Sequence, residues 1–103
     1  MRHDLFVFTD EIYEHFLYDG RRHISPGALP GMEDRTITIS GFSKTYSITG
    51  WRIGYSASDP RWARMIGYMH DLVYVCAPSP LQWGVVAGLN ELSTRFYCQL
   101  AKD

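Results

Sequence analysis

The sequence has 103 residues, of which 46% are hydrophobic and 15% aromatic, and its net charge at pH 7 is −1. This length is enough for one small hydrophobic core but not for two domains. Charges of both signs are mixed along the chain, so nothing in their distribution favours binding to nucleic acid or to an anionic membrane. No apolar run is long enough to span a bilayer.

The cysteines and histidines do not follow a metal-binding pattern. Cys76 and Cys98 are the only cysteines, and the four histidines have no His-x-x-x-His or His-x-His spacing. We therefore expect no zinc site and no disulfide scaffold, and we interpret both cysteines as reduced packing residues. The N-terminus does not have the pattern of a signal peptide, which favours a cytoplasmic protein.

An apolar run at residues 5–9 predicts the first strand. Its hydrophobicity is continuous, which is typical of a parallel strand covered on both faces. Asp10 follows at the carboxyl end, where open α/β sheets bind ligands. Its carboxylate can pair with a protonated ring nitrogen, and the Tyr13 hydroxyl can donate to an oxygen of the same ring. On spacing alone, a turn aspartate and an ordinary half-buried tyrosine are the favoured interpretations.

The region after this strand is predicted to be a connection. Residues 14–30 contain the turn signal Asp19-Gly20 and two further Pro/Gly pairs, which interrupt regular structure. A strand is then expected at residues 36–40, which alternate and are β-branched. This strand carries Ser40 and delivers the segment 41–44 at its end. Two strand ends thus converge on one edge of a sheet.

Residues 40–55, SGFSKTYSITGWRIGY, contain the strongest candidates for chemistry. Lys44 lies in a loop of small residues, so its amine can approach a ligand closely. Alternation over residues 51–56 predicts a strand in which Arg52 leaves the apolar face and turns toward that loop. An amine and an anion-binding guanidinium suit a Schiff base with an anionic aldehyde cofactor. On pattern alone, a surface lysine and an edge-strand arginine are an equally good interpretation.

Helices are predicted for the rest of the chain. Asp59-Pro60 has the pattern of an N-cap and first helical position, and the apolar residues over 62–73 recur as the stripe of an amphipathic helix. We interpret Met65 and Met69 on this stripe as core. Residues 77–80 end this helix and begin a second, whose small residues permit close helix packing. Ser93 is expected to cap a last helix.

The same segment resembles the cofactor-lysine segment of the class I/II aminotransferases, the aspartate aminotransferase-like branch of fold-type I pyridoxal-phosphate enzymes. Their pattern is a serine before the lysine and then Gly-x-Arg-x-Gly, present here as Ser43-Lys44 and residues 50–54. Upstream, residues 9–13 are similar to the family's Asp-x-x-Tyr strand end. The similarity extends from about Leu5 to about Leu92.

The resemblance implies an α/β fold, with a mixed, mostly parallel sheet flanked by helices. It also implies that residues 1–103 form part of the large domain of such an enzyme. The family's N-terminal phosphate loop and its C-terminal small domain have no counterpart in this sequence. We therefore expect little or no turnover from the chain alone, exposed strand edges, uncovered apolar helix surface and self-association.

The resemblance also assigns roles to individual residues. It implies that Lys44 forms a Schiff base with pyridoxal 5′-phosphate and moves a proton during amino transfer from an amino acid to a 2-oxo acid. Asp10 would keep the ring nitrogen protonated, and Tyr13 would hydrogen-bond the ring oxygen. Arg52 would bind the phosphate, with Ser40 or Ser43 as further donors; many relatives have a serine where this chain has Gly41. The family is usually homodimeric.

Three other interpretations remain open. A lyase, decarboxylase or synthase of the same fold would use the same visible groups, because reaction choice depends on residues elsewhere. A non-catalytic regulatory domain would sense the cofactor and carry an attached DNA-binding segment. In a structural or binding domain, Lys44 would be incidental. The sequence does not specify the amino donor.

Overall fold

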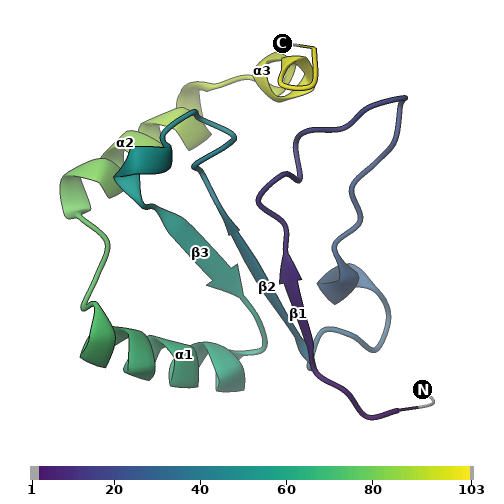
Figure 1. Ribbon diagram of the computed structural model, residues 1–103, viewed down its shortest axis with the longest axis vertical. Helices are drawn as coiled ribbons and strands as arrows, with labels where there is room; N and C mark the ends of the chain where they lie inside the picture. Colours follow the sequence, from purple (N-terminus) through teal and green to yellow (C-terminus); the bar gives the residue numbers. More distant parts are fainter. Residues whose placement is uncertain (1–2, 103) are drawn as a thin grey trace.

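The computed structural model describes residues 3–102 and contains one mixed sheet of three strands, in the order β1-β2-β3. Strand β1 runs parallel to β2, whereas β3 is antiparallel to β2. Figure 1 shows α1 and α2 beyond the β3 edge, at opposite ends of the sheet, and the connection between β1 and β2 beyond the other edge. The elements are β1 (Val7–Asp10), η1 (Pro26–Ala28), β2 (Thr36–Gly41), η2 (Thr49–Trp51), β3 (Gly54–Ala57), α1 (Pro60–Val73), α2 (Ser79–Glu91) and α3 (Thr94–Gln99).

The register of the sheet brings two strand ends together. Asp10 lies beside Ile39 in the parallel pair, and Gly41 lies beside Gly54 in the antiparallel pair. The carboxyl ends of β1 and β2 therefore meet at one edge of the sheet, and β3 begins there. This confirms the predicted convergence of the Asp10 strand end with the segment that carries Lys44.

The predicted helix boundaries follow local signals closely. The Asp59 side chain accepts a hydrogen bond from the Arg61 backbone N–H at 2.9 Å, and Pro60 is the first residue of α1, as expected. Ser93 occupies the N-cap position of α3, although its side chain makes no capping hydrogen bond. Within residues 3–102, no helix combines the length and the apolar character that crossing a membrane requires.

Three burial predictions are wrong. Strand β1 was expected to be covered on both faces, but Phe8 on this strand is 68% exposed. Met65 and Met69 on α1 are 62% and 55% exposed, and Cys76 and Cys98 are also exposed rather than packed. The radius of gyration, 15.4 Å, exceeds the roughly 13 Å expected for a compact domain of this size. The apolar stripe of α1 is present as predicted, but nothing within the described residues covers it.

Two glycines of α2 lie against aromatic side chains from the segment that carries Lys44. A Cβ at Gly84 would lie 2.6 Å from the Trp51 ring, and one at Gly88 would lie 3.0 Å from the Tyr46 ring. The Tyr46 hydroxyl is also 2.8 Å from that of Tyr97, within α3. These small residues therefore allow the Tyr46 and Trp51 rings, from the segment between β2 and β3, to pack directly against α2.

Close backbone contact between β2 and β3 makes Gly54 intolerant of a side chain. A Cβ there would lie 2.9 Å from the Ser40 carbonyl oxygen, a backbone atom that cannot move alone. We expect Gly54→Ala to lower the free energy of unfolding by about 1–3 kcal/mol. The matched control is Gly67→Ala in α1, where a Cβ meets nothing within 4 Å; it should raise stability by about 0.5–1 kcal/mol. The measurement is urea unfolding, and an equal change in the free energy of unfolding for Gly54→Ala and Gly67→Ala would contradict this prediction.

Candidate active site

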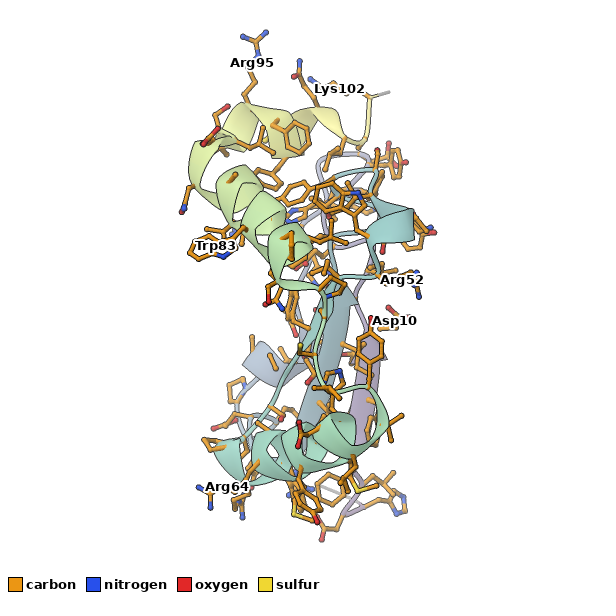
Figure 2. The ribbon with its side chains drawn as sticks, turned by 90° about the vertical axis from the view of Figure 1, so that its left-hand side faces the viewer. Asp10, Arg52, Arg64, Trp83, Arg95 and Lys102 are labelled. Atoms are coloured by element: carbon orange, nitrogen blue, oxygen red, sulfur yellow. The ribbon has the colours of Figure 1, made fainter. Side chains whose placement is uncertain are left out.

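An open pocket lies where the ends of β1 and β2 meet the start of β3. Its volume is about 330 Å³, within the usual range for small-molecule sites. Figure 2 shows Asp10 and Arg52 next to each other on the same side of the molecule. The charged and hydroxyl-bearing residues that line the pocket are Asp10, Ser40, Ser43, Lys44, Thr49 and Arg52.

Lys44 lies in a single helical turn that follows β2 directly. The turn is closed by hydrogen bonds from the Tyr46 N–H to the Phe42 carbonyl at 3.0 Å and from the Ile48 N–H to the Ser43 carbonyl at 3.1 Å. Lys44 is half-buried, and its neighbour Thr45 is 4% exposed. The segment therefore holds the Lys44 backbone firmly beside the pocket that this residue lines.

Arg52 reaches the pocket in a way that the sequence pattern did not predict. The expected strand over residues 51–56 begins only at Gly54, and Arg52 ends the short helix η2 in a left-handed conformation, with φ 57° and ψ 40°. This conformation costs a non-glycine residue about 1–2 kcal/mol. The guanidinium donates to the Thr49 carbonyl at 3.2 Å. The prediction of a strand at Arg52 is wrong, although the prediction that Arg52 lies near Lys44 is confirmed.

Asp10 and Tyr13 lie in the turn after β1. The Asp10 carboxylate is exposed and accepts a hydrogen bond from the Ile12 N–H at 3.2 Å. Tyr13 is not among the residues that line the pocket, but its ring centroid is 6.0 Å from the Lys44 amine. Within residues 3–102, neither Asp10 nor Lys44 nor Arg52 forms an ion pair. Their charged groups are thus free to meet a ligand.

The two candidate serines differ in what their hydroxyls contact. Ser40 is 5% exposed, and its hydroxyl shares its one proton between the Glu11 carbonyl at 3.2 Å and the Glu14 carboxylate at 3.1 Å. Its position alternates with Ile39, which shares the face of Asp10, so the Ser40 hydroxyl points away from the pocket. Ser43 is half-buried beside Lys44. The geometry therefore favours Ser43 over Ser40 as a donor to a ligand.

Sequence reasoning did not identify Thr49 as a pocket residue. Thr49 lines the pocket, and its hydroxyl donates to the Ser43 carbonyl at 3.2 Å. This hydrogen bond joins the two ends of the segment 43–49, which contains Lys44. Thr49 lies between the lysine and the Gly-x-Arg-x-Gly pattern, and its hydroxyl within a segment of small residues was an available signal. It closes the loop between Lys44 and Arg52.

Comparison with known proteins identifies the family. The sequence model of the family described as "Aminotransferase class I and II" matches residues 1–97. The chain belongs to the class I and II aminotransferases. It is 41% identical over 89 residues to the putative aminotransferase YugH of Bacillus subtilis, which covers 86% of this chain and 23% of that protein. It is 55% identical over 62 residues to an aspartate aminotransferase of Pyrococcus abyssi, covering 60% of this chain and 16% of that protein.

Solved structures of aminotransferases have the same fold over this region. N-succinyldiaminopimelate aminotransferase from Mycobacterium tuberculosis matches with a TM-score of 0.88 and 31% identity, over 95% of this chain and 25% of that one. The aromatic aminotransferase from Pyrococcus horikoshii matches with a TM-score of 0.86 and 37% identity, over 98% and 26% of the two chains. The chain thus spans about a quarter of the length of these aminotransferases, and its fold is part of the aminotransferase large domain.

A buried carboxylate, Glu11, lies behind the pocket. Burial alone would raise the pKa of Glu11, but hydrogen bonds from Thr9, His23 and Ser25, together with the positive charge that His23 can carry, outweigh it and hold this pKa below its usual value. A carboxylate whose pKa is lowered by folding stabilises the protein above its unfolded pKa, and this contribution is lost as the pH falls through the folded value.

Acid should therefore remove the contribution of Glu11 to stability. We expect the difference in free energy of unfolding between the wild type and Glu11→Gln to be constant well above the ordinary pKa of 4.5 and to shrink as the pH falls below it. The measurement is urea unfolding of both proteins along a pH series. A difference that stays constant down to the acid limit of folding would contradict a lowered pKa.

Proposed function

We propose that this chain forms the cofactor-lysine region of a pyridoxal-phosphate-dependent aminotransferase. The observation that carries the proposal is that Asp10, Lys44 and Arg52 line one pocket, although they come from the end of β1, the turn after β2 and the end of η2. Membership of the aminotransferase family supports it. Because the chain spans about a quarter of its relatives, the activity is proposed for the protein that contains this region.

The residues present fit the cofactor. Pyridoxal phosphate presents an aldehyde, a ring nitrogen, a ring oxygen and a phosphate, and the pocket offers an amine, a carboxylate, a guanidinium and a hydroxyl. Lys44 would hold the aldehyde carbon covalently, and Asp10 would pair with the protonated ring nitrogen. Arg52 would bind the phosphate with its planar fork, with Ser43 as a further donor. Tyr13, beside the Lys44 amine, would donate to the ring oxygen.

The chemistry needs a group that stabilises negative charge at the α-carbon of an amino acid, and the bound cofactor supplies this as an electron sink. The Lys44 amine, free once the amino acid has taken its place, would take the proton from that α-carbon and deliver it to the carbon that was the cofactor's aldehyde. Asp10 keeps its partner nitrogen protonated, because a nearby carboxylate favours the charged form. Arg52 and Ser43 hold the phosphate, so the reacting atoms stay within reach of Lys44.

The substrates that we propose are an amino acid and a 2-oxo acid. The relatives described above are aminotransferases by name, including an aspartate and an aromatic enzyme. These names favour amino transfer over the lyase, decarboxylase and synthase alternatives. We propose a homodimer for the protein that contains this region, as is usual in the family.

Borohydride trapping tests the proposal. The chain has only two lysines, Lys44 and Lys102, so the site of attachment can be assigned unambiguously. The purified chain is mixed with pyridoxal phosphate, reduced with borohydride and digested, and the labelled peptide is identified by mass spectrometry. We expect the label on Lys44. Label confined to Lys102 or to the N-terminal amine would overturn the proposal.

A further inference from the structure

Glu11 is a buried carboxylate that the proposed chemistry does not use. It is 7% exposed, and an ionised carboxylate is retained in such a place only when hydrogen bonds replace its hydration. Asp10 lines the pocket. The hydrogen-bond ladder between β1 and β2 continues one residue further, because the Glu11 N–H donates to the Ile39 carbonyl at 2.8 Å. Because neighbours in extended backbone alternate, the Glu11 side chain lies on the opposite face of the sheet.

Hydrogen bonds to the Glu11 carboxylate join three segments of the chain. One oxygen accepts from the Thr9 hydroxyl of β1 at 2.7 Å and from the Ser25 hydroxyl of the connection at 2.8 Å. The Thr38 hydroxyl of β2 lies 3.4 Å from the same oxygen. The other oxygen is 2.6 Å from a ring nitrogen of His23. Both strands and the connection between them are therefore fastened to one side chain.

These contacts do not form a catalytic group of their own. The Ser25 hydroxyl donates to the carboxylate of Glu11, whose lowered pKa makes it a weak base and a poor activator of a nucleophile. The His23 ring is likewise bonded to Glu11 rather than to a hydroxyl. The cluster is therefore an anchor, and its effect is on the backbone of the turn.

The backbone of Glu11 is fixed as firmly as its side chain. Its carbonyl accepts from the Ser40 hydroxyl at 3.2 Å and from the Glu14 N–H at 2.9 Å. The Glu14 carboxylate in turn accepts from Ser40 and from the Tyr55 hydroxyl, each at 3.1 Å. The turn is thus bonded to the strand that leads to Lys44 and to β3. Asp10 and Tyr13 lie on either side of this fixed point.

We propose that Glu11, assisted by Ser40, is a positioning residue that holds the turn bearing Asp10 and Tyr13 against the strand that delivers Lys44, from the face opposite the pocket. The proposal rests on the cofactor roles proposed above for those residues. Its mechanism is indirect, because Glu11 does not line the pocket. A loosened turn would weaken the hydrogen bond from Tyr13 to the ring oxygen. The form of the cofactor in which this oxygen carries a full negative charge would then lose stabilisation.

The variants Glu11→Ala and Glu11→Gln test this, with the exposed Glu91→Ala in α2 as the matched control. The readout is the pH midpoint of the visible absorbance band of the chain loaded with pyridoxal phosphate. We expect Glu11→Ala to raise the midpoint by about one pH unit. Glu11→Gln should stay close to wild type, because its amide oxygen can still accept from Thr9 and Ser25. If Glu11→Ala does not fold, Thr9→Val removes the shortest hydroxyl bond and should raise the midpoint by a smaller amount.

Amide hydrogen exchange of residues 10–14 in the ligand-free chain is the second readout. We expect about tenfold faster exchange in Glu11→Ala than in wild type or Glu91→Ala. Faster exchange with an unchanged midpoint would show a merely structural role and overturn the proposal, and so would unchanged exchange. If the wild type binds no cofactor, the proposed function fails, and the exchange measurement alone decides whether Glu11 holds the turn.

Discussion

Replacing Lys44 with alanine is expected to reduce borohydride-trapped pyridoxal phosphate to the background seen without reduction. Alanine has no amine, and no other nitrogen nucleophile lines the pocket among the described residues. Lys44→Arg should also trap nothing, because its guanidinium stays protonated. It keeps a positive charge in the pocket, however, so the cofactor should still bind without a covalent bond. The measurement is the mass of the intact chain after reduction.

Lys102→Ala is the matched control for this experiment. Lys102 is exposed near the C-terminus, and Figure 2 shows it at the end of the molecule far from Asp10 and Arg52. We expect this variant to trap the cofactor as well as the wild type does. If Lys44→Ala and Lys102→Ala lose label to the same extent, the labelling is non-specific and Lys44 has no special role.

Replacing Arg52 with alanine is expected to raise the concentration of pyridoxal phosphate needed for half-maximal labelling by about 10- to 100-fold. A hydrogen bond to a charged group contributes about 1.5–3 kcal/mol, and each 1.4 kcal/mol corresponds to tenfold in affinity. Arg52→Lys keeps the charge but loses the planar fork, so its loss should be smaller. The left-handed conformation at φ 57° costs alanine about as much conformational free energy as it costs arginine. A change in the backbone of the loop should therefore not account for the weaker binding of Arg52→Ala.

Two comparisons make the Arg52 result specific. Arg64→Ala, at an exposed position on α1 that lies far from Asp10 and Arg52 in Figure 2, should leave labelling unchanged. Pyridoxal without its phosphate should label wild type and Arg52→Ala equally, because the lost contact is to the phosphate. An equal loss for both compounds would mean that Arg52 supports the loop and does not bind phosphate.

The convergence of the site was predictable because it depends on local patterns. The apolar run before Asp10 and the alternating run before Lys44 each predict a strand, and parallel neighbours bring their carboxyl ends to one edge. The helix start at Asp59-Pro60 is likewise encoded in two adjacent residues. In these cases, short-range sequence signals and the final structure agree.

The path of the backbone at Arg52 was not predictable from alternation. Residues 51–56 alternate like a strand, but η2 and a left-handed residue replace its first part. Arginine rarely adopts this conformation, so composition gives no warning of it. This segment contacts α2, which lies about 30 residues later in the sequence, and the Trp51 ring packs against Gly84 there. Such a contact between residues far apart in sequence has no local signature.

The anchor around Glu11 and the exposure of Met65 and Met69 on α1 were missed for the same reason. Glu11 next to Asp10 looks like part of a solvated turn, and only the fold brings Thr38 and Ser25 to its carboxylate. The stripe on α1 predicts a face that can be buried, but it does not say what covers that face. Among residues 3–102, nothing does, and Met65 remains 62% exposed.

The most direct test of this account is a crystal structure of the chain after reduction with pyridoxal phosphate. We predict one ligand bonded to the Lys44 nitrogen, with its ring nitrogen at hydrogen-bond distance from the Asp10 carboxylate and its phosphate on the Arg52 guanidinium. A ligand attached to Lys44 whose ring nitrogen and phosphate reach neither Asp10 nor Arg52 would contradict it.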